Sequence, residues 1–173
     1  MIAAAHVMAG LVAGVAALSA RSSASRLATG FGLGVLSHVV LDAIPHSDYG
    51  SLPRSALLMS VAVEIVATLG LAWYLLRDRR LPGLRFALPA GLAGAMIPDL
   101  KFARYFLPPP AASWVHDVGD RFHAPFHAGP TTVTVGLTLE VTCTLLLFGA
   151  LLLLIRRQDG PHTGLGKAPS SAR

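Results

Sequence analysis

The chain has 173 residues, of which 53% are hydrophobic and only 13% are charged, and its mean hydropathy is +0.60. Because a soluble domain is roughly 25% charged, this composition excludes an ordinary soluble domain and favours an all-α, polytopic membrane protein. The formal charge of +5 comes from cations at the ends of apolar runs, where membrane orientation explains them, so we expect no nucleic-acid partner.

Long apolar runs predict one integral membrane domain over residues 1–157, a bundle of about five spans that each approach the length needed to cross a bilayer. The predicted spans are residues 2–20, 27–45, 55–76, 84–100 and 131–155. The fourth reaches a spanning length only when its polar ends are included, and a re-entrant segment is the alternative. Residues 158–173 are rich in Gly, Ser and Pro and predict a disordered cytoplasmic tail.

The first run ends in small residues, as a cleaved signal peptide does, but no Lys or Arg precedes it and it contains His6. We therefore interpret it as a span. More Lys and Arg follow the first, third and fifth spans than follow the second and fourth. In a bacterial-type cytoplasmic membrane, this bias predicts an N-terminus outside and a C-terminus in the cytoplasm.

Small residues recur four apart in three of these spans, a spacing that lets helix backbones approach closely in lipid. The pairs are Gly10 and Gly14, Gly30 and Gly34, and Ala90 and Gly94. We predict that they form packing surfaces between helices.

Ionisable residues within the spans fall toward one side of the predicted bundle, when each is placed at about 1.5 Å of depth per residue. They are His6, His38, Asp42, Glu64 and Glu140, with Asp99 at the matching end of the fourth span and His123 and His127 in the loop after it. Burying such groups is costly unless they are paired, hydrated or metal-bound. No Lys or Arg lies deep enough in the spans to neutralise the acids, so we predict a divalent metal ion.

The segment SHVVLDAIPHSDY offers the closest set of ligands, because residues four apart share a helix face. His38 can pair with Asp42, or Asp42 can pair with His46 and Asp48 where Pro45 ends the helix. His38 and His46 are about 12 Å apart along a straight helix, too far to bind one ion through bonds of about 2 Å. The segment therefore has room for one ion, or for two ions bridged by Asp42.

The loop HDVGDRFHAPFH repeats this spacing, and its best candidate ligands are His123 and His127. Histidines and carboxylates with a single cysteine, Cys143, suit zinc, manganese or iron, and the histidine count favours zinc. The predicted metal ligands are His6, His38, Asp42, His46, Asp48, Asp99, His123 and His127. Simpler explanations stay open for some: His6 as a packed histidine, and Asp99 as a polar stop after a span.

These residues resemble the motifs of the membrane-bound metal-dependent hydrolases of the YdjM type, which have an early histidine in the first span and PD or HxxxD motifs at helix ends. The similarity runs from His6 through SHVVLDAIPHSD and IPDL to FHAPFH. That family is thought similar to helical zinc phospholipases C and nucleases, which implies phosphoester hydrolysis.

Our leading hypothesis is a membrane-embedded metal-dependent hydrolase whose ion lowers the pKa of bound water and polarises a phosphoryl or carbonyl oxygen. Glu64 is the predicted general base, although Ser60 and Thr68 on its helix face favour an interhelical hydrogen-bond role instead. Entry at the bilayer surface suggests a lipid or lipid-linked phosphoester as substrate. The alternative is a membrane protein without catalytic activity, which binds metal for structure or conducts ions or protons.

Overall fold

The computed structural model describes residues 3–45, 54–79, 81–99 and 131–158, together with residues 108, 110–111, 113–114, 117 and 120–121. Within these ranges every regular element is a helix and no strand occurs, which confirms the all-α prediction. The elements are α1 (Ala3–Ala16), the short 3-10 helix η1 (Ala17–Ser19), α2 (Ser23–Asp42), α3 (Arg54–Arg77), α4 (Leu84–Met96) and α6 (Val133–Gln158). The predicted tail after Gln158 lies outside the described residues.

Each predicted span corresponds to one helical region, but the helices differ in length. By length and composition, two helical segments of the described chain are able to cross a membrane: Ser23–Asp42 and Thr134–Gln158. By contrast, α1 and α4 have 14 and 13 residues. At 1.5 Å per residue each is about 20 Å long, which is shorter than a hydrocarbon core of about 30 Å.

The bounds of α2 follow from local chemistry at both ends. It begins at Ser23, four residues before the predicted start, because Ser22 forms a capping box in which its hydroxyl accepts from the Ser25 backbone N–H and the Ser25 hydroxyl accepts from the Ser22 N–H. It ends at Asp42, before the predicted end at Pro45, because a proline disfavours helical backbone in the residue before it.

We expect Ser22→Ala to lower the free energy of unfolding by about 1 kcal/mol, the usual cost of removing an N-cap hydroxyl. The neighbouring exposed Ser23 provides the matched control, since Ser23→Ala leaves the capping box intact. Thermal unfolding in detergent, followed by circular dichroism, measures both. Equal losses in the two variants would contradict a specific capping role.

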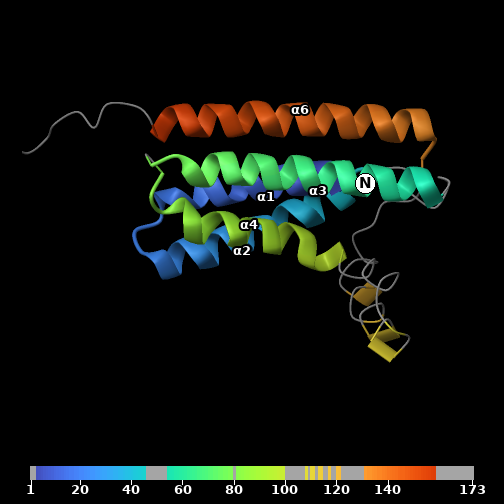
Figure 1. The fold of residues 1–173 in the computed structure, drawn as a ribbon, viewed down its shortest axis with the longest axis horizontal. Coiled ribbons are helices and arrows are strands. Elements are labelled where there is room, and N and C mark those ends of the chain that lie inside the picture. Colours follow the sequence, from blue (N-terminus) through green and yellow to red (C-terminus); the bar gives the residue numbers. More distant parts are fainter. Residues whose placement is uncertain are drawn as a thin grey trace, which may run out of the picture.

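The helices alternate in direction along the bundle (Figure 1), so the start of α1, the end of α2, the start of α3, the end of α4 and the start of α6 all lie at one end. Extensive contacts join α1, α2 and α4 to one another and α1 to α6, whereas α3 makes fewer contacts, with α1 and α4. Leu11, Leu84 and Leu88 are fully buried members of the apolar core between α1 and α4. This alternation brings the polar ends of several helices together, as predicted.

The predicted small-residue surfaces are confirmed as points of close backbone approach. A Cβ atom added to Gly10 would lie 2.9 Å from Leu92 Cα, and one added to Gly14 would lie 2.7 Å from Leu88 Cα. On α2, a Cβ at Gly34 would lie 2.8 Å from the backbone nitrogen of Ala95. These helices are therefore close enough that short polar side chains reach from one to the next.

Candidate metal centre

A buried polar cluster is formed by His6 of α1 with His38 and Asp42 of α2, each only 1% exposed. The two carboxylate oxygens of Asp42 face different histidines. Oδ1 lies 3.2 Å from His6 Nε2, and Oδ2 lies 3.0 Å from His38 Nε2. The predicted pair of His38 and Asp42, four residues apart on one face, is thus in direct contact.

One oxygen of Asp42 faces His6, which is also a predicted ligand of the site. His46 and Asp48, the other predicted partners of Asp42, lie outside the described residues, so their part stays a prediction. His6 reaches Asp42 because α1 packs on α2. The contact fits both explanations of His6, as a metal ligand and as a packed, hydrogen-bonded histidine.

The two imidazole rings are stacked, with centroids 4.2 Å apart and an angle of 28° between their planes. This stacking directs both Nε2 atoms toward the same carboxylate. One ligand atom from each of His6, His38 and Asp42 lies within 4.8 Å of the others, so the group could hold a metal ion. Ligands bound to one zinc ion at about 2.0–2.2 Å are separated by roughly 3 to 3.5 Å, close to the two distances found here.

The hydrogen bond at the other nitrogen of His38 decides how this cluster must be charged. His38 Nδ1 lies 2.6 Å from the carbonyl oxygen of Ala95, which can only accept, so Nδ1 must carry the proton. In a neutral ring Nε2 is then an unprotonated acceptor, and it faces the Asp42 carboxylate at 3.0 Å. Two acceptors at this distance require a positive charge between them, supplied either by a proton or by a metal ion.

Asp99 is the next acid to the cluster, with Oδ1 4.0 Å from His38 Nε2 and its side chain 12% exposed. It lies in the short 3-10 turn that follows α4, four residues after Ala95. This end of α4 therefore supplies both a carbonyl group for Nδ1 of His38 and a carboxylate near Nε2. Asp42 and Asp99 thus approach the same histidine.

Glu64, the predicted general base, lines a different cavity with Ala56, Met59 and Val63 of α3, and no member of the histidine cluster is among the described residues lining it. The sequence places Thr68 on the helix face of Glu64, as a possible hydrogen-bond partner. The Thr68 hydroxyl donates to the backbone carbonyl of Glu64 at 2.6 Å. A catalytic role for Glu64 stays a prediction.

The remaining sequence candidates divide into two groups. His123 and His127 lie outside the described residues, so their predicted part in the site stays a prediction. Glu140 of α6 is 5% exposed and lines a groove with Ala4 of α1, and no member of the histidine cluster is among the described residues lining that groove.

The sequence interpretation missed the carbonyl group of Ala95, which fixes the protonation of His38. A backbone acceptor has no signature in the side-chain pattern, and its role depends on which helix packs against α2. The only available signal was the small-residue surface that includes Ala90 and Gly94, since that surface determines where α4 approaches α2.

Comparison of the chain with family models, curated proteins and solved structures gives no significant match. The function of the protein is therefore inferred from the geometry of the cluster and the chemistry of its residues.

Proposed function

We propose that this protein is a membrane-embedded metal-dependent hydrolase and that His6, His38 and Asp42 hold its divalent ion. The observation that carries the proposal is the acceptor pair at Asp42. The Ala95 carbonyl leaves His38 Nε2 as a lone-pair donor aimed at a buried carboxylate. Metal-binding histidines commonly donate their second ring N–H to a backbone carbonyl, which fixes the tautomer in this way.

The surface of the bundle supports a membrane location. Only 22% of the apolar window of α2 and 11% of that of α6 is buried inside the protein, whereas the core helix of a soluble protein would be mostly buried. Exposed large apolar side chains also cover α3, among them Val63, Val66, Leu69 and Trp73. We propose that all five helical regions lie within the bilayer, with the shorter α1 and α4 enclosed by their neighbours, and that the cluster lies toward the outer side.

Zinc is the ion we propose. Two histidines and one carboxylate are the ligands of a known class of catalytic zinc sites, in which a fourth position is left for water or substrate. The same ligand set also occurs in iron(II) oxygenases, so iron is the principal competitor. The absence of thiolate ligands in the group is consistent with either metal.

Each residue of the cluster then has a distinct part. His6 and His38 would contribute nitrogen ligands, and Asp42, which lies between the two rings, would offset one of the two charges of the ion. The Ala95 carbonyl holds the His38 ring. Asp99, next to His38 Nε2, is placed to accept a proton from a nucleophile. The ion, when bound, would activate water and polarise a phosphoryl oxygen.

We propose a lipid or lipid-linked phosphoester as the substrate, because the cluster lies near one end of a bundle with an apolar exterior. The resemblance to the YdjM-type hydrolases favours the same reaction by analogy. The protein's partners would then be the bilayer itself and a phosphoester within it.

Hydrolysis by the purified protein in lipid nanodiscs tests this proposal. A panel of phospholipids and lipid-linked phosphates is incubated with protein that has been treated with chelator and then reloaded with zinc, and the released phosphate, phosphorylated headgroup and lipid products are measured by mass spectrometry. We expect turnover only in the reloaded sample, and its loss in His38→Ala. If stoichiometric zinc binds but the whole panel is untouched, the structural or transport alternative replaces the hydrolase.

A further inference from the structure

We propose that a groove between α1 and α6 binds a long-chain lipid alcohol, with the hydroxyl group held by Glu140 and Thr144. The groove has a volume of about 270 Å³ and is lined by Ala4, Leu137, Glu140, Val141, Thr144 and Leu145. Sites for whole small molecules begin at about 300 Å³, so this groove fits one segment of a chain.

The walls of the groove are apolar and open outward. Leu137, Val141 and Leu145, spaced four apart on α6, are 43%, 56% and 64% exposed. In the membrane location proposed above, these side chains face the acyl region of the bilayer. An alkyl chain can therefore enter the groove laterally, without passing through water.

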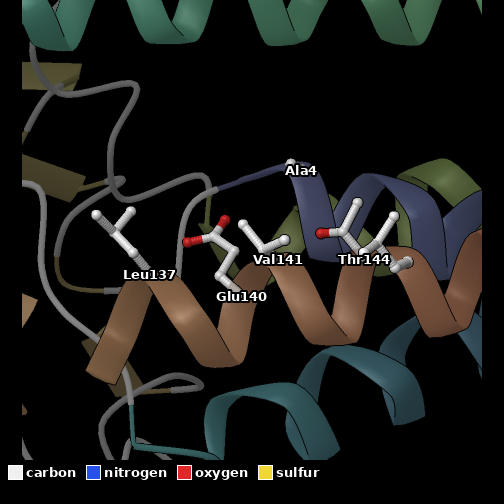
Figure 2. A pocket seen from close by; sticks show the side chains of 6 residues that line it. Ala4, Leu137, Glu140, Val141 and Thr144 are labelled. Atoms are coloured by element: carbon white, nitrogen blue, oxygen red, sulfur yellow. The ribbon is translucent and has the colours of Figure 1, made fainter. Parts of the chain in front are cut away.

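Two polar groups interrupt this apolar lining. Figure 2 shows the carboxylate of Glu140 and the hydroxyl of Thr144 on the side of α6 that faces Ala4. Glu140 is only 5% exposed, so its carboxylate lies in the depth of the groove, between more exposed walls.

The hydroxyl of Thr144 differs from those of Thr138 and Thr142 in the same helix. Thr138 and Thr142 donate to the backbone carbonyl four residues earlier, at 2.9 Å and 2.7 Å. Thr144 Oγ1 is buried and has no hydrogen-bond partner among the residues that the structure describes. A buried hydroxyl normally finds a partner, which indicates that a ligand supplies one here.

An alcohol matches this pair of groups. Its O–H donates to the Glu140 carboxylate, and its oxygen accepts from the Thr144 hydroxyl, without adding a charge to an apolar groove. The groove and the histidine cluster share helix α1, because Ala4 of the groove lies two residues before His6. Hydrolysis of a lipid phosphomonoester with water would release phosphate and a lipid alcohol, and hydrolysis of a lipid phosphodiester would release a phosphomonoester and the alcohol, so the groove is suited to the alcohol released in either case.

This inference rests on the proposed function in two respects. The groove faces lipid only if the protein lies in a membrane, and the alcohol is the product of the proposed hydrolysis. The binding test uses dodecanol carrying a photoreactive diazirine, with the full chain in nanodiscs, and maps the labelled peptides by mass spectrometry. We expect labelling of α6 around Val141, competed by dodecanol but not by its methyl ether. Val141→Trp, which fills the groove, should abolish the labelling.

The matched variants are Thr144→Val and Thr142→Val, which remove hydroxyls from the same helix. Thr144→Val and Glu140→Gln should each reduce labelling about fivefold, the effect of one hydrogen bond, and Thr142→Val should leave it unchanged. Equal labelling in all variants, or equal competition by the methyl ether, would overturn the proposal, as would stronger competition by dodecylamine.

Bound metal, measured in the same samples, separates this proposal from the hydrolase. Thr144→Val should retain its metal, so a loss of labelling there reports on the groove alone. If His38→Ala retains metal while specific labelling persists in the unmutated protein, the hydrolase proposal fails and the groove proposal stands.

Discussion

Replacing Asp42 with asparagine is expected to lower zinc affinity by at least about 100-fold. Replacing a residue that only orients a metal ligand typically lowers metal affinity or activity about 10- to 100-fold. Asp42 contacts both histidines of the cluster, one with each carboxylate oxygen. Asparagine keeps the size of the side chain but removes its charge. Zinc titration of the purified protein, with metal content determined by mass spectrometry, measures the effect.

The control for this experiment is Glu64→Gln, which also neutralises an acid within a helix of the bundle. Glu64 lines a separate cavity on α3, so its replacement should leave zinc affinity unchanged even if it lowers activity. Equal affinity in Asp42→Asn and the unmutated protein would exclude Asp42 as a ligand. Unfolding measurements on both variants verify that each is folded.

The second large effect is expected at Gly34, where α2 meets α4. A Cβ atom at this position would lie 2.8 Å from the backbone nitrogen of Ala95, and backbone atoms cannot move aside as a flexible side chain can. Gly34→Ala should therefore lower the free energy of unfolding by about 1–3 kcal/mol. Because Ala95 holds His38, the same variant should also bind zinc more weakly.

Gly32 provides the matched control on the same helix. A Cβ at Gly32 meets no atom within 4 Å among the described residues. Gly32→Ala should therefore be neutral or stabilise the protein by up to about 1 kcal/mol, because alanine favours helix over glycine. Thermal unfolding in detergent compares the two variants. Similar stability in both would contradict the close approach of α2 and α4.

Parts of the site could be predicted from the sequence because they depend on helix periodicity. His38 and Asp42 share a face for that reason, and they are in contact. The alternation of helix direction likewise places His6 and Asp99 at the same end of the bundle as Asp42. The position of a residue along its helix axis follows from its residue number, at about 1.5 Å per residue. The positions of these three residues could therefore be predicted without knowing how the helices pack.

Other parts of the site depend on how helices cross, which local spacing does not determine. The sequence predicts His6 as a ligand but not which side chain it meets, and the packing of α1 on α2 brings it to one oxygen of Asp42. The role of the Ala95 carbonyl arises in the same way. The predicted part of His46 lies outside the described residues. The α-helix α4 ends at Met96 and continues as a 3-10 turn to Asp99, a change of helix type that an apolar run does not predict.

The segment around His38 supplies only part of the cluster, as expected from the prediction that ionisable residues of several spans lie toward one side of the bundle. The cluster combines α1 and α2 and is supported by α4, with Asp42 between two stacked imidazole rings. Its assembly depends on close helix packing at glycine, which links the stability of the bundle to the chemistry of the site.

X-ray absorption spectroscopy of the zinc-loaded protein tests whether His6, His38 and Asp42 bind one zinc ion. We expect one tightly bound zinc ion with two imidazole ligands and a carboxylate oxygen at about 2.0–2.2 Å. The imidazole signal should be reduced in His6→Ala and in His38→Ala. A protein that does not retain zinc, or a zinc spectrum that shows no imidazole and is unchanged in both variants, would contradict this assignment of ligands.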